Sequence, residues 1–232
     1  MFCTLLSQDI IYTLKATVKD MIRTAVAVGG FSSNAGKTTL VCELLRELSG
    51  WEAIKVTRGH YRSCGKDPHA CCVSHLLGEK PLIRSGREET YAPGKDTGRY
   101  WDAGASNVHW LIATKEQVEQ GIHKALERVS APGVIIEGNS FQKFIDVDFA
   151  VMVACAGGGK IKPSARRALK NCSAIYLFDE RDESGASARR RFNLWLQDEN
   201  ERELISSIPI YTRVELPQLT KRIIEIHTPV AL

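Results

Sequence analysis

The chain has 232 residues, of which 44% are hydrophobic and 25% charged, and its net charge is +4. This length fits one sizeable α/β domain, and the charge is far below that of a dedicated nucleic-acid binder, so we expect no DNA partner. No hydrophobic run reaches the ~18 residues of a membrane span, which predicts no membrane partner. The seven cysteines are unevenly spaced, which favours reduced thiols in the cytoplasm over a disulfide framework.

Hydrophobic runs of strand length alternate with helical patterns along most of the chain. Met21 lies just before the first predicted strand. Residues 1–20 are therefore predicted to be an N-terminal extension or the result of a misplaced start, and residues 21–232 to form one domain. The predicted strands are Arg23–Val28, Glu52–Val56, Val108–Ala113, Gly133–Ile136, Phe149–Cys155, Ala174–Phe178 and Ile208–Tyr211. The predicted helices are Lys37–Leu48, Pro68–Leu77, Lys115–Val129, Pro163–Asn171, Gly185–Leu196 and Pro217–Ile226. The alternation predicts a three-layer α/β fold with a mainly parallel sheet.

A glycine-rich run from Gly29 to Leu40 joins the first predicted strand to the first helix. It contains Gly36-Lys37-Thr38, and Gly30 gives the spacing G-x-x-x-x-x-G-K-T, one residue longer than the usual Walker A pattern. Such a loop holds phosphate with backbone N–H groups and a lysine, while the threonine hydroxyl binds Mg²⁺. The residues expected to contact a nucleoside triphosphate are Ser33, Asn34, Ala35, Gly36, Lys37, Thr38 and Thr39.

A carboxylate ends a later hydrophobic strand, in the sequence Val134-Ile135-Ile136-Glu137-Gly138. In phosphate-loop proteins an acid in this position orients Mg²⁺ opposite the loop threonine, so Thr38 and Glu137 are the predicted magnesium residues. The run from Gly94 to Ala105 is interpreted as a loop carrying a cation, a carboxylate and a hydroxyl. From its residues alone, this loop either reaches over a bound triphosphate or is a solvated turn.

Four motifs in order resemble the molybdopterin-guanine dinucleotide biosynthesis protein B family. Besides the phosphate loop, they are Ile54-Lys55-Val56-Thr57, Gly94-Lys95-Asp96-Thr97 followed by Ala103-Gly104-Ala105, and Ile135-Ile136-Glu137-Gly138. They cover about half to two-thirds of the chain. The spacing of the phosphate loop is also similar to that of dethiobiotin synthetases, a related branch of P-loop NTPases.

This resemblance implies a P-loop NTPase fold and a dimeric GTP-binding accessory protein of molybdenum cofactor assembly that hydrolyses nucleotide slowly. It makes Lys37, Glu137 and Asp96 the candidate catalytic residues and adds Lys55 to the nucleotide-binding set. A cofactor-assembly enzyme is the implied protein partner. The chain departs from the family in its N-terminal segment, its longer C-terminal third and an insertion at about 58–80.

That insertion is rich in cysteine and histidine. Thiolates and imidazoles together suit Zn²⁺, and thiolates suit an iron–sulfur cluster, although the spacing matches no standard zinc finger. The alternative is that the cysteines are small packing residues. The candidate ligands are His60, Cys64, His69, Cys71, Cys72 and His75.

Two other functions fit the same residues. One is an ATP-dependent kinase or ligase of small molecules, similar to dethiobiotin synthetase. The other is a metal or cofactor carrier controlled by the bound nucleotide. No Asn-Lys-x-Asp sequence is present, so the preference for GTP over ATP rests on the resemblance alone.

Overall fold

The computed structural model describes residues 24–59, 73–179, 185–196 and 199–227. The predicted extension 1–20 lies outside these residues, as does most of the cysteine- and histidine-rich segment. Within the described part, no helix is both long and apolar enough to cross a membrane.

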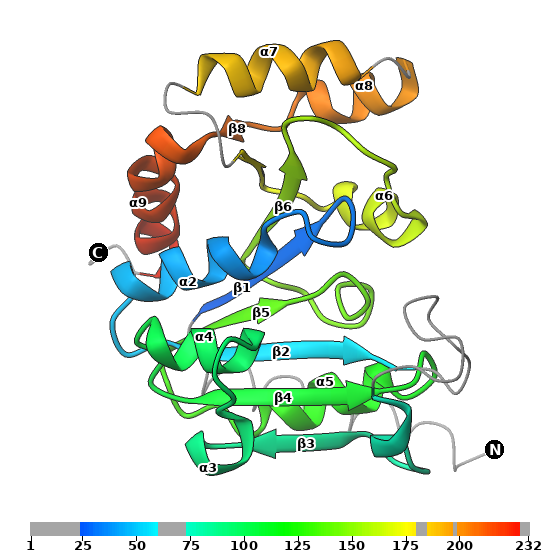
Figure 1. The fold of residues 1–232 in the computed structure, drawn as a ribbon, viewed down its shortest axis with the longest axis vertical. Helices are drawn as coiled ribbons and strands as arrows, with labels where there is room; N and C mark the ends of the chain where they lie inside the picture. Colours follow the sequence, from blue (N-terminus) through cyan, green and yellow to red (C-terminus); the bar gives the residue numbers. More distant parts are fainter. Residues whose placement is uncertain (1–23, 60–72, 180–184, 197–198, 228–232) are drawn as a thin grey trace, which may run out of the picture.

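An eight-stranded sheet lies at the centre of the described residues, in the order β3-β4-β2-β5-β1-β6-β7-β8 (Figure 1). Its strands are β1 (Thr24–Gly30), β2 (Glu52–Arg58), β3 (Leu82–Ser85), β4 (Val108–Ala113), β5 (Gly133–Glu137), β6 (Phe149–Cys155), β7 (Ala174–Phe178) and β8 (Ile210–Tyr211). Every neighbouring pair is parallel except β3 with β4. The prediction of a mainly parallel sheet is therefore confirmed.

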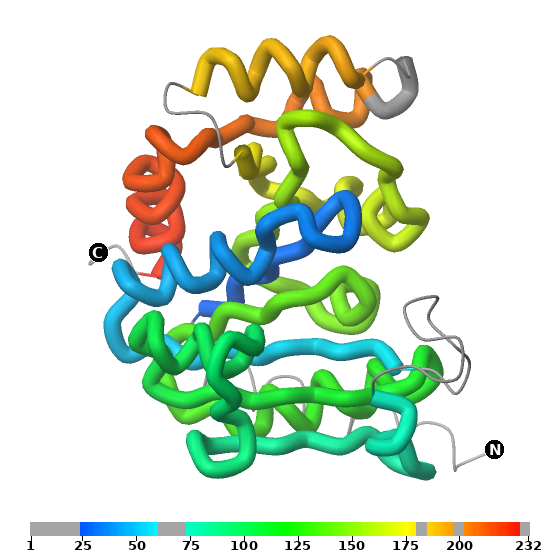
Figure 2. Tube along the Cα trace, in the orientation of Figure 1, coloured from blue at the N-terminus to red at the C-terminus, as the bar shows by residue number. Residues whose placement is uncertain are grey.

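Helices cover both faces of the sheet, so the fold has three layers (Figure 2). One face packs against α2 (Lys37–Glu47), α4 (Asp96–Asp102) and α9 (Leu216–His227). The other packs against α5 (Val118–Leu126), α6 (Pro163–Leu169), α7 (Ala186–Trp195) and α8 (Glu199–Ser206). The short helix α3 (Arg87–Thr90) and the 3₁₀ turns η1 (Ser74–Leu76) and η2 (Arg213–Glu215) complete the described elements.

Strands with continuous hydrophobic sequence lie in the middle of this sheet. All five residues of β5 are buried, and six of the seven in β6 are buried. Strands covered by helices on both faces need such runs, since successive side chains point to opposite faces. The face that packs on α2 receives Ile135 and Val151, whereas Val134, Ile136 and Ala150 face α5.

The region between β2 and β4 contains most of the differences from the sequence-based prediction. It holds β3, α3 and α4, none of which was predicted, and the run from Gly94 to Ala105 is mainly helix rather than a loop. A glycine inside α4 and only two aliphatic residues in β3 hide these elements from pattern analysis. The described part of the predicted helix Pro68–Leu77 forms only the 3₁₀ turn η1.

A buried hydrogen bond between Glu52 and His109 ties β2 to β4 at the amino ends of the strands, away from the phosphate loop. The carboxylate of Glu52 accepts a hydrogen bond from Nε2 of His109 at 2.7 Å, and both side chains are at most 2% exposed. The other oxygen of Glu52 accepts from the Ser130 amide at 3.0 Å, the Ser130 hydroxyl at 2.8 Å and the Ala131 amide at 2.9 Å. Burial opposes the charged form of Glu52, but the hydrogen bonds from His109 and Ser130 outweigh it, and the pKa of Glu52 is lowered.

Because the pKa of Glu52 is lower in the folded chain, its contribution to stability is fully present above pH 4.5, the ordinary pKa of glutamate. That contribution is lost as the pH falls through the folded pKa. We expect Glu52→Gln to lower the free energy of unfolding by about 2–4 kcal/mol at pH 7, and by less at pH 3.5. Urea unfolding at both pH values measures this, with the exposed Glu127→Gln as control. An effect of Glu52→Gln that is equal at both pH values would contradict the prediction.

Candidate nucleotide site

The loop between β1 and α2 is shaped by close contacts of its glycines. The side chain of Lys37 crosses Gly30, and a Cβ atom on Gly30 would lie 2.8 Å from Cδ of Lys37. The next residue, Phe31, is 3% exposed and packs against Phe192 and Trp195. Phe31 therefore anchors the loop in the core, and the glycine of the motif stands one residue earlier than in the usual pattern.

Gly36 occupies the N-cap position of α2. Its φ of +89° is a left-handed conformation that favours glycine, and a Cβ atom here would lie 2.2 Å from the ring of Phe178. No side chain caps this helix by a hydrogen bond, and no acidic residue lies in its first turn. Every helix leaves the N–H groups of its first turn without partners inside the helix. In α2 no side chain of the N-cap or first turn occupies them, so they can bind a phosphate.

A cavity of about 380 Å³ opens beside this loop. Nine of the residues predicted for the site line it, namely Ser33, Asn34, Gly36, Lys37, Thr38, Thr39, Lys55, Asp96 and Glu137. Arg99 and Phe178 complete the lining. The structure therefore brings together residues from five separate segments at the carboxyl edge of the parallel strands, where such sheets bind ligands.

Glu137 is the centre of the polar contacts in this cavity. Lys55 and Glu137 are register partners of neighbouring parallel strands, so their side chains project side by side on the same face. Nζ of Lys55 lies 2.5 Å from Oε1 of Glu137 and 2.6 Å from Oδ2 of Asp96. The hydroxyl of Thr38 donates to Oε2 of Glu137 at 2.9 Å, and the buried hydroxyl of Tyr100 donates to the same oxygen.

These contacts set the charges in the cavity. Burial disfavours the charged form of Lys55, but Glu137 and Asp96 outweigh it and raise the pKa of Lys55. Burial likewise opposes ionisation of Asp96, yet the charge of Lys55 prevails and lowers the pKa of Asp96. For Lys37, burial prevails over the attraction of Glu137 and lowers its pKa. An anion entering the cavity would stabilise the charged form of Lys37, because it would supply the counter-charge that burial now denies.

Helix α4 contributes residues that the sequence alone did not assign to the site. Arg99 and Tyr100 follow Asp96 by three and four positions, so one helical face carries all three toward the cavity. Burial and the neighbouring Glu137 raise the pKa of Tyr100 well above its ordinary value, so Tyr100 stays protonated and donates to Glu137. Treating residues 96–102 as a helix would have revealed this spacing. The other unassigned lining residue, Phe178, carries no such signal, because it is simply the last residue of β7.

Two sets of predicted residues lie elsewhere or outside the described part. The side chain of Ala35 is fully buried in the core, so only its backbone is available to a ligand. Of the predicted metal ligands, only His75 is described, as an exposed residue of η1. The remaining five are His60, Cys64, His69, Cys71 and Cys72, which lie outside the described residues.

Comparison with known proteins identifies the fold. No family model matches the sequence, and no curated protein matches it. Among solved structures, the chain is similar to HypB from Helicobacter pylori in complex with nickel, with a TM-score of 0.51, 15% identity and coverage of 95% of both chains. The chain has a P-loop NTPase fold. At this identity the similarity concerns the fold alone.

Two further solved structures were matched at lower similarity. The LAO/AO transport system kinase gives a TM-score of 0.43 at 12% identity, with 94% of this chain and 64% of that one covered. A Zn(II)-bound triple mutant of the YjiA GTPase gives 0.39 at 14% identity, with 82% of this chain and 57% of that one covered.

Proposed function

We propose that this P-loop chain binds a purine nucleoside triphosphate with Mg²⁺ and hydrolyses it slowly. The observation that carries the proposal is the cavity in which the uncapped start of α2, Lys37, Thr38 and Glu137 converge. Backbone N–H groups and the lysine would hold the phosphates. Ser33 and Asn34, at the mouth of the loop, are both exposed to the solvent from which the nucleotide enters.

The residues beside Thr38 suit Mg²⁺, which prefers oxygen ligands. The Thr38 hydroxyl lies 2.9 Å from a carboxylate oxygen of Glu137, and Asp96 lines the same cavity. Thr38 would hold the ion directly and Glu137 through water. When bound, the ion would neutralise phosphate charge. Lys37 would add its own positive charge to the transferring phosphoryl group, and Lys55 would hold Glu137 and Asp96 in place.

Slow hydrolysis is proposed because the cavity offers no strong general base among its described residues. Asp96 is ion-paired with Lys55 and its pKa is lowered, which makes it a weak proton acceptor. Glu137 accepts hydrogen bonds from Thr38, Lys55 and Tyr100. Fast turnover would require a partner protein or a second substrate to complete the site.

The more specific role that we propose is that of a GTP-dependent accessory protein in molybdenum cofactor assembly, cytoplasmic and dimeric, acting beside a cofactor-assembly enzyme. The four family motifs support it, since each contributes a side chain to one cavity, namely Lys37, Lys55, Asp96 and Glu137. A nucleotide-dependent metal carrier is the second candidate. It is favoured by the similarity to a protein solved in complex with nickel and by the cysteine- and histidine-rich segment of this chain.

Calorimetry with Mg·GTP and Mg·ATP tests nucleotide binding. We expect Lys37→Ala to weaken binding by about 100-fold, because the variant loses charge-assisted hydrogen bonds to phosphate. Lys124→Ala removes an exposed lysine of α5 and serves as the control. Unchanged affinity in Lys37→Ala would overturn the proposed site.

Metal analysis of protein purified without chelator distinguishes the two roles. An equivalent of zinc, iron or nickel whose retention changes with GTP would favour the carrier. Less than about a tenth of an equivalent would end that alternative. Rapid turnover that appears only with a carboxylate or alcohol substrate would instead favour a ligase or kinase.

A further inference from the structure

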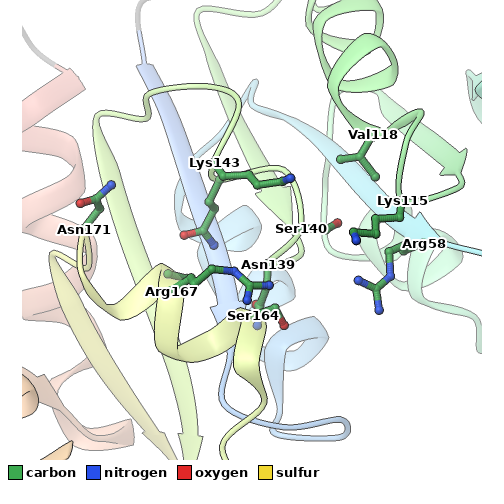
Figure 3. A pocket seen from close by; sticks show the side chains of 11 residues that line it. Arg58, Lys115, Val118, Asn139, Ser140, Lys143, Ser164, Arg167 and Asn171 are labelled. Atoms are coloured by element: carbon green, nitrogen blue, oxygen red, sulfur yellow. The ribbon is translucent and has the colours of Figure 1, made fainter. Parts of the chain in front are cut away.

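A second cavity, of about 140 Å³, lies on the other face of the sheet from α2 (Figure 3). Four segments contribute cations to its lining: Arg58 ends β2, Lys115 precedes α5, Lys143 follows β5, and Arg167 lies on α6. In Figure 3 the amino groups of Lys115 and Lys143 point toward Ser140 from opposite sides, and the guanidinium of Arg167 points toward Asn139.

Two local features explain how one sheet edge carries two cavities: side chains alternate along β2, and the chain turns after β5. Lys55 of β2 faces the nucleotide cavity, and Arg58, three residues on, projects to the opposite face. Glu137 also lines the first cavity, whereas Asn139 and Ser140 line the second, because the chain turns at Gly138 after β5 ends. The two cavities therefore share their supporting strands but no lining residue.

The second cavity is distinctly positive. Its described lining contains four cationic side chains and no carboxylate. The exposed Glu116 lies near Lys115 and Arg58 but does not line the cavity. Four like charges around so small a space repel one another, which is tolerated more easily when an anion occupies it.

Besides the apolar Val118 and Ala168, the lining contains neutral hydrogen-bonding groups. They are the hydroxyls of Ser140 and Ser164 and the amides of Asn139, Gln142 and Asn171. The Asn139 side chain is held in place because it accepts from the Gly30 amide at 2.8 Å and donates to the Gly30 carbonyl at 2.8 Å. One wall of the second cavity is thus attached directly to the phosphate loop.

We propose that this second cavity binds a phosphate group, either as the free ion or as the phosphate of a small phosphomonoester. Two guanidinium groups and two ammonium groups supply the charge for a dianion. Arginine forks match the geometry of phosphate oxygens, and lysine acts as a point charge. The site shares no lining residue with the proposed nucleotide site, so Lys37 and Thr38 take no part in it.

Phosphorus NMR titrations with inorganic phosphate test this site. Because phosphate can also enter the nucleotide cavity, we compare the wild type with Lys37→Ala, Arg167→Gln and Lys143→Gln. Two phosphate-binding sites are expected in the wild type. Lys37→Ala should keep the second site, and each of the other two variants should weaken that site by at least about tenfold.

Lys170→Gln is the matched control, because it removes one positive charge at the end of α6 from a residue that does not line the cavity. Arg167→Gln or Lys143→Gln that binds phosphate as tightly as the wild type would overturn the proposal, as would an equal loss in Lys170→Gln. Lys143, Arg167 and Lys170 are exposed, so each variant is expected to fold. Thermal unfolding of each variant checks this.

A parallel titration with phosphoglycolate identifies the source of the phosphate group. Tighter binding of the ester than of inorganic phosphate would indicate a phosphorylated small molecule, and tighter binding of inorganic phosphate would indicate the free ion. Binding of neither compound to Lys37→Ala would refute the second site. The affinity of the wild type for Mg·GTP tests the nucleotide site separately.

Discussion

Glu137→Gln is expected to lower the rate of nucleotide hydrolysis by about 100- to 1000-fold. Glutamine keeps the size of the side chain but removes the charge that faces Thr38 and Lys55. It also presents an amide donor toward one of the groups that now donate to the carboxylate, so at least one hydrogen bond is lost. Single-turnover hydrolysis at saturating nucleotide, measured across a magnesium titration, checks this.

The variant is expected to fold, because Lys55 keeps Asp96 as a counter-ion. Glu43→Gln is the matched control, since Glu43 also accepts a hydrogen bond from a tyrosine, Tyr176 at 3.2 Å, but does not line the cavity. Glu43→Gln should hydrolyse nucleotide at the wild-type rate. Wild-type turnover in Glu137→Gln at every magnesium concentration would remove Glu137 from the proposed mechanism.

Gly36→Ala is expected to lower the free energy of unfolding by about 2–5 kcal/mol and to abolish measurable nucleotide binding. An alanine here must adopt a left-handed conformation at φ +89°, and its Cβ atom would lie 2.2 Å from the ring of Phe178. Either the ring or the start of α2 has to move, and the N–H groups of the loop would then lose their common orientation. Urea unfolding and calorimetry measure the two effects.

A second glycine separates the cost of the left-handed backbone from the cost of the clash with Phe178. Gly50 has a similar φ of +79°, but a Cβ atom added there would meet nothing within 4 Å. Gly50→Ala should therefore cost only the conformational part, about 1 kcal/mol, and leave nucleotide binding intact. When Gly36→Ala is made in a Phe178→Ala background, the cost of the alanine should fall to a similar value, since the ring is gone. An unchanged cost in that background would show that the ring contact is not responsible.

Much of the nucleotide site was predictable because its central motifs are local. Gly36, Lys37 and Thr38 are contiguous between a strand and a helix, and Glu137 is the last residue of a hydrophobic strand. For the same reason the seven predicted strands all appear, with ends that shift by at most a few residues. Lys55 and Asp96 came from the resemblance alone, and the contact of each with the other required the fold.

What pattern analysis missed has a common physical cause. Helix α4 contains Gly98 in its interior and has no helical hydrophobic period. Its intrinsic helix propensity is therefore low, and it is helical because of its tertiary packing. Tyr100 reaches Glu137, and Arg99 reaches the cavity, only because tertiary contacts fold this segment into a helix.

By itself, then, the sequence determined seven of the eight strands, the phosphate loop and the acidic strand end, since these depend on neighbours along the chain. Only the tertiary structure decided that Phe178 packs on Gly36, and that Arg58, Lys115, Lys143 and Arg167 surround one cavity. These residues come from segments far apart in sequence, and the face of the sheet on which each side chain lies depends on strand order and register, which no local pattern encodes.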